Sequence, residues 1–502
     1  MKPSPSRSTL LSHFRENREN RQMLFWTAGL QILAWLIYKW CIPGTDHFQD
    51  SYSYVYAAIH GYTIFYRPMG YARFLALLHE LSGSSDLVVT CQYFLMSWAA
   101  LAFFFSVDYL LTFRNRWIKW LSCALTCLQP LLLVLANLLA GDGLFAALTI
   151  LWITTLLWVL LRPGWWALML QALALYLAFQ VRYNALYYPL ISCLVFLMAV
   201  RVSLLYRAAG ILFTLLLTGS GYHSIRASTE DQTGADVFSG FSGWQMANNA
   251  LYLSPFIDLK EESFEDPDLR ELHGYVREFV DSIDPISRRE AQEGKIGSAY
   301  LWDNHSPLKQ YLFNYSRVNR QPYLQSWYQV ATLYGDYGKA LILDHPMAFY
   351  RHFLWPNACS YVMPDGECLT KYHNSTIPVP KETAEWFGWD GENPEPAPRW
   401  AGVQQGIIGC YPPMHALLFL SCLVLPFGWL VSRKWGRDRH DRDGRAQSRE
   451  EGMRLLWFWY LLFLLNIVFS IVASPIVLRY EGYWFVLGGC IPLWFLDRKI
   501  VY

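Results

Sequence analysis

The chain reads WIKWLSCALTCLQPLLLVLANLL from Trp117 to Leu139 and, after a short linker, LFAALTILWITTLLWVLL from Leu144 to Leu161. Each run is close to the roughly 20 apolar residues that an α-helix needs to cross the hydrocarbon core of a bilayer. We assign two membrane spans here, Trp117–Leu135 and Leu144–Leu161, joined through Asn137–Gly143. The two runs predict a membrane protein.

The same criterion gives eight further spans, so we predict an α-helical polytopic membrane protein with about ten transmembrane helices. Hydrophobic residues make up 54% of the chain and charged residues 16%, against roughly 25% charged in a typical soluble protein. The net charge of +1 gives no basic field that would favour nucleic acid as a partner. The further spans are Met23–Trp40, Leu87–Leu111, Trp165–Phe179, Ala185–Val200, Leu204–Gly219, Met414–Val431, Leu455–Ala473 and Gly482–Leu496.

Lys and Arg residues concentrate in alternate loops, and this asymmetry predicts the orientation, because basic residues stay on the cytoplasmic side. Both termini and the basic segment 433–453 are then cytoplasmic, and the large polar segment 223–409 lies outside. The expected organisation is an N-terminal transmembrane module (1–222), an extracytoplasmic domain (223–409) and a C-terminal transmembrane module (410–502).

Two features of the polar segment give local predictions. Cys359 and Cys368 flank a Pro- and Gly-containing turn, and on the oxidising side of the membrane a disulfide between them is expected. The stretch from His345 to Pro356 has the pattern of an amphipathic helix that lies on a membrane surface. No Cys or His spacing indicates a metal site, so no cofactor is firmly predicted and a divalent-metal requirement stays open.

The predicted topology places a set of charged residues at or near membrane depth on the outer side. Charges there are costly and usually face a cavity. Four separate loops supply them, which predicts a polar site where the loops converge over the helices. The set is Asp46, Asp50, Arg67, Asp142, Arg182, Arg479 and Glu481.

Each position has an ordinary structural alternative. Asp50 and Asp142 stand where helices are expected to start, and Asp is a favourable N-cap. Arg182 and Arg479 suit snorkelling or phospholipid contact, and Arg67-Pro68 forms a turn by itself. The coincidence of these residues on one side therefore carries more weight than any single one.

The loop sequences resemble a known family. The first outer loop contains Asp50-Ser51-Tyr52-Ser53-Tyr54 and then Tyr66-Arg67-Pro68-Met69-Gly70-Tyr71, followed by Ala72-Arg73-Phe74-Leu75. This loop resembles that of GT-C fold glycosyltransferases that use polyprenyl-phosphate sugars, the group that includes protein O-mannosyltransferase-like and aminoarabinose transferase-like enzymes. Asp142 at the start of the fourth span, Arg182 after the fifth, and Arg479-Tyr480 before the last are similar to residues of the same group. The chain departs from the pattern at Met69 and Ala72, where prolines are common, and at Ser51, where a second acidic residue is common.

The resemblance implies a fold, a reaction and a location. It implies a GT-C-like helical bundle in a bacterial inner (plasma) membrane. There a sugar moves from a polyprenyl-phosphate donor to a hydroxyl of a lipid, glycan or protein acceptor, with inversion at the anomeric carbon. Asp50 is the expected general base and Asp46 its rival, while Arg182 and Arg479 bind the phosphate. Arg67, Asp142 and Tyr480 are expected to contact substrate or orient the arginines.

Two other classes of function remain as alternatives. A transporter or flippase of lipid-linked glycans would distribute charges through the membrane midplane and show two related halves. The charges here collect on one side, and no internal repeat is apparent. A non-catalytic membrane scaffold with an outer binding domain is the other alternative.

Overall fold

The computed structural model describes residues 9–260, 264–282, 297–373, 378–389, 398–435 and 444–500. Within these ranges, six helices are long and apolar enough to cross a membrane, and two shorter apolar helices accompany them. The chain is therefore an α-helical membrane protein. The six are Ser85–Leu111, Arg116–Asn137, Gly141–Leu161, Leu204–Thr233, Gly402–Ser432 and Glu450–Ala473, and the shorter ones are Trp165–Val181 and Tyr183–Met198. The span Arg116–Asn137 is interrupted before Pro130, so it consists of two helical segments.

The remaining predicted spans have a different form in the structure. The first lies in α2 (Arg18–Cys41), which is long but is not apolar enough to be one of these six helices. The tenth is divided into α23 (Gly482–Gly488) and α24 (Ile491–Ile500), because the chain turns at Gly489 and Cys490. A Cβ at Gly489 would lie 2.7 Å from the backbone carbon of Leu125, so only glycine permits this close approach to the neighbouring helix.

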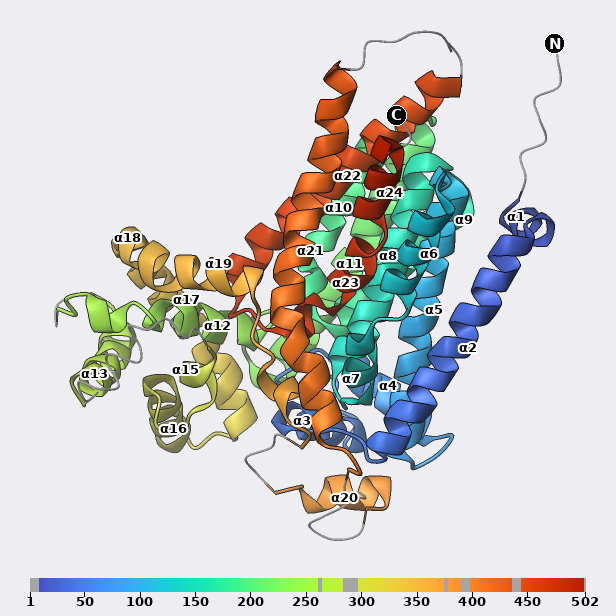
Figure 1. Ribbon diagram of the computed structural model, residues 1–502. Coiled ribbons are helices and arrows are strands. Elements are labelled where there is room, and N and C mark those ends of the chain that lie inside the picture. Colours follow the sequence, from blue (N-terminus) through green and yellow to red (C-terminus); the bar gives the residue numbers. More distant parts are fainter. Residues whose placement is uncertain are drawn as a thin grey trace.

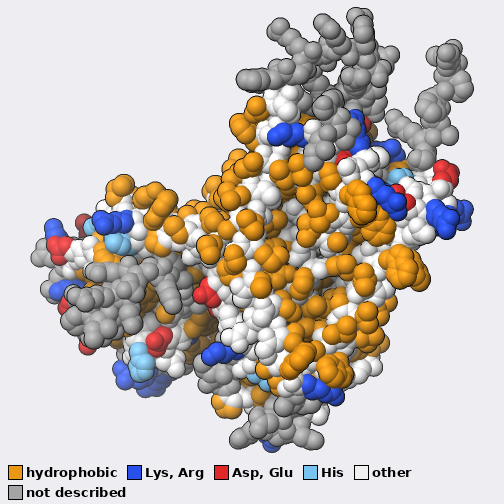
Figure 2. All heavy atoms as spheres, viewed as in Figure 1, with side chains coloured by type: hydrophobic (Ala, Val, Ile, Leu, Met, Phe, Trp, Pro, Cys, Tyr) orange, Lys and Arg blue, Asp and Glu red, His pale blue; other side chains and the backbone are white. Residues whose placement is uncertain are grey.

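The apolar helices form one upright bundle (Figure 1). Hydrophobic side chains cover the middle of its surface, and charged side chains gather toward its two ends (Figure 2). This is the surface that a lipid bilayer requires. The bundle contains α1 (Leu10–Glu16), α2, α5 (Ser85–Leu111), α6 (Arg116–Cys127), α7 (Pro130–Asn137), α8 (Gly141–Leu161), α9 (Trp165–Val181), α10 (Tyr188–Met198), α11 (Leu204–Thr233), α21 (Gly402–Trp435), α22 (Gly444–Ala473), α23 and α24.

The two ends of the bundle are distinct. Helix α1 and the last turn of α24 lie at one end, which we call the α1 end (Figure 1). Three short helices cover the opposite end, the α3 end: α3 (Gln49–Ile59), α4 (Gly70–His79) and α20 (Lys381–Phe387). Residues 436–443, in the middle of the predicted basic segment 433–453, lie outside the described part of the chain.

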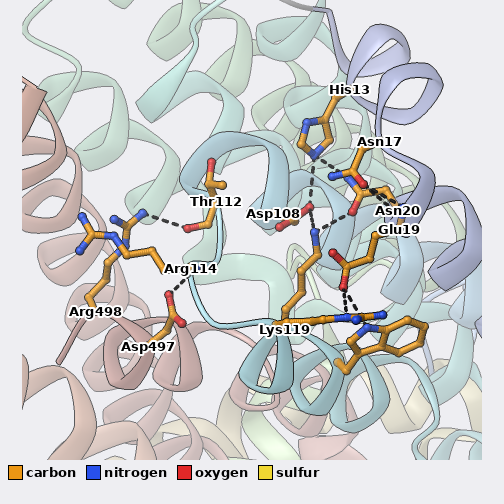
Figure 3. A network of polar contacts seen from close by, with 12 residues as sticks. His13, Asn17, Glu19, Asn20, Asp108, Thr112, Arg114, Lys119, Asp497 and Arg498 are labelled. Atoms are coloured by element: carbon orange, nitrogen blue, oxygen red, sulfur yellow. Dashed lines mark hydrogen bonds and ion pairs between the residues drawn. The ribbon is translucent and has the colours of Figure 1, made fainter. Parts of the chain in front are cut away.

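A polar network holds the helices together at the α1 end (Figure 3). The buried carboxylate of Asp108 accepts a hydrogen bond from Lys119 Nζ at 2.8 Å, and His13 Nε2 lies 3.2 Å from the same oxygen. Lys119 also donates to Asn20 Oδ1 at 2.6 Å. Asp497 on α24 accepts hydrogen bonds from the backbone N–H groups of the loop between α5 and α6. The contacts of Asp108 thus join four helices around a paired charge, as a buried charge needs, and Asp497 attaches α24 to the same end through backbone N–H groups.

A second group of helices projects from one side of the bundle and has its own hydrophobic core (Figure 1). We call it the lateral domain. Its helices are α12 (Gly240–Leu251), α13 (Pro267–Ser282), α15 (Ala299–Trp302), α16 (Pro307–Asn319), α17 (Tyr323–Asp344), α18 (Pro346–Phe349) and α19 (Trp355–Val362), with a π-helical turn, η3 (Tyr350–Leu354), between the last two. The domain core is built on stacked Trp244 and Trp327, whose ring centroids lie 5.5 Å apart. Helix α11 continues to Thr233 and α21 begins at Gly402, so both helices extend into the segment 223–409 that was predicted as the extracytoplasmic domain.

The predicted disulfide between Cys359 and Cys368 is wrong. Both are free thiols in the structure. Cys359 lies exposed on α19, whereas Cys368 lies buried in the 3₁₀ helix η4 (Glu367–Thr370) and packs in the core of the bundle. The turn between them therefore carries the chain from the lateral domain back to the bundle and does not close a loop.

Candidate active site at the α3 end

Asp50 lies in the first turn of α3, but it does not cap this helix. The helix starts after Phe48, whose backbone N–H donates to Ser51 Oγ at 3.1 Å. Ser51, the residue that departs from the family pattern, therefore supplies the cap. The Asp50 carboxylate is free to point elsewhere, and it pairs through Oδ1 with Arg67 and through Oδ2 with Arg479 Nη1 at 3.2 Å.

Arg67 reaches the site because α4 packs very closely on the end of α9. A Cβ at Gly70 would lie 2.5 Å from the carbonyl carbon and oxygen of Gln180, so glycine is needed at this contact. The contact places the Arg67 turn beside the Arg182 segment. The Arg67 guanidinium also lies over the ring of Trp302 in the lateral domain, 5.5 Å from its centroid. Trp302 thus connects the two parts of the protein at the site.

Asp142 and Arg182 meet at the junction of two bundle helices. Asp142 follows the N-cap Ala140 by two residues, so it lies inside α8 and does not cap it. Its Oδ1 pairs with Arg182, which is the C-terminal cap of α9 in an extended conformation. The Arg182 guanidinium lies 4.3 Å from the ring centroid of Tyr480. Burial of the pair shows that Arg182 points into the protein and not toward lipid headgroups.

Arg479 lies at the centre of these contacts. It belongs to the 3₁₀ helix η5 (Leu478–Glu481) that precedes α23, and its side chain is only 8% exposed. Its Nη1 lies 3.2 Å from Asp50 Oδ2 and 3.6 Å from Asp142 Oδ2, and its Nε lies 3.0 Å from Glu367 Oε2. Nη2 donates to the Tyr480 hydroxyl at 3.2 Å. One guanidinium therefore joins three carboxylates from three different segments.

The result is a compact group of alternating charges, which we call the arginine cluster. It consists of Asp50, Arg67, Asp142, Arg182, Glu367 and Arg479. Three carboxylates balance three guanidiniums in this group. Burial opposes ionisation of Asp50, but Arg67 and Arg479 outweigh burial and hold its pKa below the usual value. Asp50 is therefore a carboxylate at neutral pH.

Asp46 lies outside the arginine cluster. Its Oδ1 accepts a hydrogen bond from the backbone N–H of His373 at 2.8 Å, and its Oδ2 accepts one from Gln404 Nε2 at 2.9 Å. Its backbone also bridges to Leu138 at the end of α7. Burial raises the pKa of Asp46 to about 7. These contacts join the first outer loop to the segments around His373, Gln404 and Leu138. Asp46, the predicted rival base, therefore has contacts that stabilise the fold and none with the arginine cluster.

Glu367 is the member of the cluster that we did not predict. It follows Asp365, whose backbone carbonyl accepts a hydrogen bond from Leu478 N–H at 2.8 Å next to Arg479. The bridge between Asp365 and Val477 brings Glu367 to the site across more than a hundred residues of sequence. Neither its local sequence nor its spacing signals this contact.

Two hollows lie along the contact between α10 and α22. The first is next to the cluster and has a mixed polar and apolar lining that includes Tyr480, Glu481 and Asn466. Glu481 Oε2 is buried there without a hydrogen-bond partner, and burial raises the pKa of this residue to about 8. The second hollow is apolar and lies nearer the α1 end. Its lining is Leu194, Leu197, Met198, Trp457 and Leu461.

Comparisons with known proteins add no family. The chain matches no protein-family model, no curated protein and no solved structure. Among the described residues, no group of three or more His, Cys, Asp or Glu side chains is arranged to hold a metal ion. The fold and the site therefore define a class, an α-helical membrane protein with a buried arginine–carboxylate cluster at one end of its bundle.

Proposed function

We propose that the protein is a membrane glycosyltransferase that moves a sugar from a polyprenyl-phosphate donor to an acceptor hydroxyl. The observation that carries this proposal is the arginine cluster, in which Arg182 and Arg479 lie side by side on Asp142 and Tyr480. Both guanidiniums contact the carboxylate of Asp142, so a single anionic group can be reached by both of them. This arrangement suits a phosphate, because one guanidinium can donate two parallel hydrogen bonds to two phosphate oxygens. The loop resemblance to GT-C fold glycosyltransferases points to the same substrate class.

In this proposal the donor phosphate binds to Arg182 and Arg479. The acceptor hydroxyl oxygen attacks the anomeric carbon as the bond from that carbon to the phosphate oxygen breaks. The phosphate leaves with the bonding electron pair, and the two arginines stabilise its charge. The acceptor proton passes to the carboxylate of Asp50, the general base. A base opposite the leaving group gives inversion.

The paired state of Asp50 has a consequence for this mechanism. Both of its oxygens contact guanidiniums in the structure, Arg67 on one side and Arg479 on the other. A carboxylate engaged in this way is a weak proton acceptor. When Arg479 turns to the donor phosphate, one oxygen of Asp50 becomes available while Arg67 keeps the other in place. Donor binding would thus activate the base.

The two hollows between α10 and α22 support a lipid-linked donor. The first hollow adjoins Tyr480, which contacts Arg182 and Arg479 of the cluster, and the apolar hollow lies along the same pair of helices. A donor with a phosphate at the cluster can lay its hydrocarbon chain along this contact, within the depth of the membrane. Apolar side chains line the second hollow, as hydrocarbon requires.

The topology belongs to the same proposal. We propose ten membrane passages, formed by the six long apolar helices, the shorter helices α9 and η1–α10 (η1, Tyr183–Tyr187), α2, and the broken pair α23–α24. The α3 end and the lateral domain then lie outside a bacterial inner membrane, and both termini lie in the cytoplasm. Lys and Arg placement in the sequence supports this orientation.

Release of polyprenyl phosphate tests the function without knowledge of the acceptor. Purified protein in nanodiscs is supplied with synthetic polyprenyl-phosphate hexoses and pentoses and an envelope extract as acceptor, and free polyprenyl phosphate is measured. We expect release by the wild type and a reduction of about 10²–10⁴-fold in Asp50→Asn, the usual contribution of general acid–base catalysis. Arg479→Lys keeps the charge but loses the paired geometry, so its donor KM rises.

Asp46→Asn is the matched control, because it removes a second buried carboxyl from the same loop but outside the arginine cluster. We expect this variant to retain release. Loss of release in Asp46→Asn with normal release in Asp50→Asn would transfer the role of base to Asp46. Release that is independent of Asp50, Arg182 and Arg479 would contradict the proposed function.

A further inference from the structure

We propose that Glu367 occupies, in the resting protein, the position on Arg479 that the donor phosphate takes, and that donor binding displaces it. This inference rests on the proposed function and deepens it, because it assigns to Glu367 the control of access to the phosphate site. The contact that carries it is the 3.0 Å pair between Glu367 Oε2 and Arg479 Nε.

The three carboxylates of the cluster differ in how firmly they are held. The Asp142 side chain is 3% exposed and that of Asp50 is 14% exposed, whereas that of Glu367 is 40% exposed. Asp50 and Asp142 each contact two guanidiniums. Glu367 contacts one. Glu367 is thus the carboxylate whose removal into water costs the least, since an exposed ion pair contributes little.

The backbone of Glu367 stays in place while its side chain can turn away. The bridge between Asp365 and Val477 fixes the segment beside Arg479, and Asp365 Oδ1 accepts a hydrogen bond from Glu367 N–H at 2.7 Å. Only side-chain rotation is then needed to open the Nε side of Arg479. This side is the remaining edge of the guanidinium, because Nη1 contacts Asp50 and Nη2 contacts Tyr480.

Charge balance indicates that one carboxylate has to leave. The cluster holds three guanidiniums and three carboxylates, so it is balanced without ligand. A bound phosphate adds negative charge to a largely buried site, and excess charge there is unfavourable. Movement of Glu367 into solvent restores the balance. Exchange of one anion for another therefore gives selectivity for ligands whose anionic group binds Arg479 better than a carboxylate does.

Binding of a long-chain polyprenyl monophosphate to the protein in nanodiscs tests this inference. Glu367→Gln keeps the size of the side chain but removes its charge, so the phosphate no longer displaces an ion pair. We expect tighter binding by up to about 5-fold, which is what an ion pair of up to about 1 kcal/mol corresponds to. Glu385→Gln on α20 is the matched control, because Glu385 is an exposed glutamate at the same end of the bundle. We expect this variant to bind the polyprenyl monophosphate with the affinity of the wild type.

Equal or weaker binding by Glu367→Gln, with normal binding by the wild type, would overturn the role of Glu367 and leave the proposed function standing. Absence of binding by the wild type would overturn both. Arg479→Lys separates the two further, since it weakens binding if Arg479 holds the phosphate, whatever Glu367 does.

An independent observation concerns the lateral domain. We infer that the helical segment 346–362 rests on the surface of the lipid bilayer at the α3 end of the membrane-spanning region. Large apolar residues are exposed along this segment and at its two flanks, from the end of α17 to the residue after α19, and we call them the apolar stripe. The members and their exposed fractions are Leu343 66%, Met347 74%, Tyr350 50%, Trp355 59% and Met363 55%.

The segment is attached where a membrane-spanning helix ends. Asn357 on the buried side of α19 donates to the carbonyl oxygens of Ile471 and Ser474, both at 2.8 Å, at the last turn of α22. The exposed surface of α22 just before this point, at Val468 and Val472, is apolar. The stripe is thus continuous with the lipid-facing surface of the bundle, and α18 and α19 run along the edge of the lateral domain nearest the α1 end (Figure 1).

The chemistry of the stripe fits lipid as the occupant. Hydrophobic side chains line this edge of the lateral domain (Figure 2). The sequence from His345 to Pro364 contains no acidic residue, and Arg351 is exposed within it. Tyr350 and Trp355 are the residue types that settle at the water–lipid boundary. An amphipathic helix of this composition is typical of interfacial binding.

A spin label on Cys359 tests the contact directly. Cys359 is exposed on α19 one turn after Trp355, and a variant in which it is the single cysteine is labelled in nanodiscs. We expect collisions with oxygen, which partitions into lipid, to exceed those with a water-soluble nickel chelate. The control is a label at Asn319→Cys, an exposed position on α16 of the same domain. We expect this label to collide more often with the nickel chelate than with oxygen. Equal exposure of both labels to nickel, or exclusion of both probes from Cys359, would overturn the inference.

Discussion

At the scale of the residue, Arg479 organises the candidate site. Its three carboxylate partners come from α3, from α8 and from η4, so the contact joins parts of the chain that are far apart in sequence. The sequence predicted Asp50, Asp142, Arg182 and Arg479 as members of one site because topology places them on one side. It did not predict Glu367, because that contact depends on a backbone bridge which leaves no pattern in the sequence.

Asp46 gives a prediction about pH. The carboxyl of an unfolded chain ionises near pH 4, whereas burial raises the pKa of folded Asp46 to about 7. Folding therefore favours the protonated form, and the stability that this provides below pH 4 is lost as the pH rises to about 7. Asn at this position does not titrate.

We therefore expect the melting temperature of Asp46→Asn, relative to the wild type, to rise between pH 4 and pH 7 and to stay constant above pH 7. Differential scanning fluorimetry in one detergent over this range measures the difference. A difference that does not change with pH would show that Asp46 is not buried as a protonated carboxyl.

At the scale of the element, apolar length predicted the helices well where each span is a continuous run. The runs at Leu87–Leu111 and Leu144–Leu161 both became long helices, α5 and α8. Apolar length predicted the helices less well where tertiary contacts break an apolar run. The last apolar run is divided at Gly489 by close contact with Leu125, which depends on the neighbouring helix and not on local sequence.

The polar network at the α1 end makes an element-scale prediction. Lys119→Met leaves the Asp108 carboxylate buried without its main cation, which costs about 3–5 kcal/mol of stability. The double variant Asp108→Leu/Lys119→Met removes both charges, so it is expected to recover most of that loss. Thermal unfolding of the wild type, of Lys119→Met, of Asp108→Leu and of the double variant in detergent gives the coupling energy between the two positions. A double variant less stable than Lys119→Met would show that the pair does not act as a unit.

At the scale of the whole molecule, charge and hydropathy predicted a helical membrane protein, and the structure has the helices that this class requires. The architecture of the lateral domain could not be predicted. Its core depends on stacked aromatic residues such as Trp244 and Trp327, and on the close contact of α12 with α17 at Gly243. Aromatic residues and glycines occur throughout the chain, so their pairing is decided only by the fold.

The proposed orientation gives the whole-molecule prediction. Single cysteines at Asn319 in the lateral domain and at His440 in the basic segment are exposed to a membrane-impermeant maleimide on intact cells. We expect labelling at residue 319 and none at residue 440 until the membrane is permeabilised, because basic residues remain in the cytoplasm. Labelling at residue 440 alone would invert the topology and place the arginine cluster on the cytoplasmic side.

The central claim is that the arginine cluster binds the phosphate of a lipid-linked sugar. Cryo-electron microscopy of the protein in nanodiscs with saturating polyprenyl monophosphate tests it most directly. We expect phosphate density between Arg182 and Arg479, with Glu367 turned away from Arg479 and the hydrocarbon chain along α10 and α22. A fully occupied lipid site elsewhere, with the pairs of Arg479 to Asp50 and Glu367 unchanged, would contradict it.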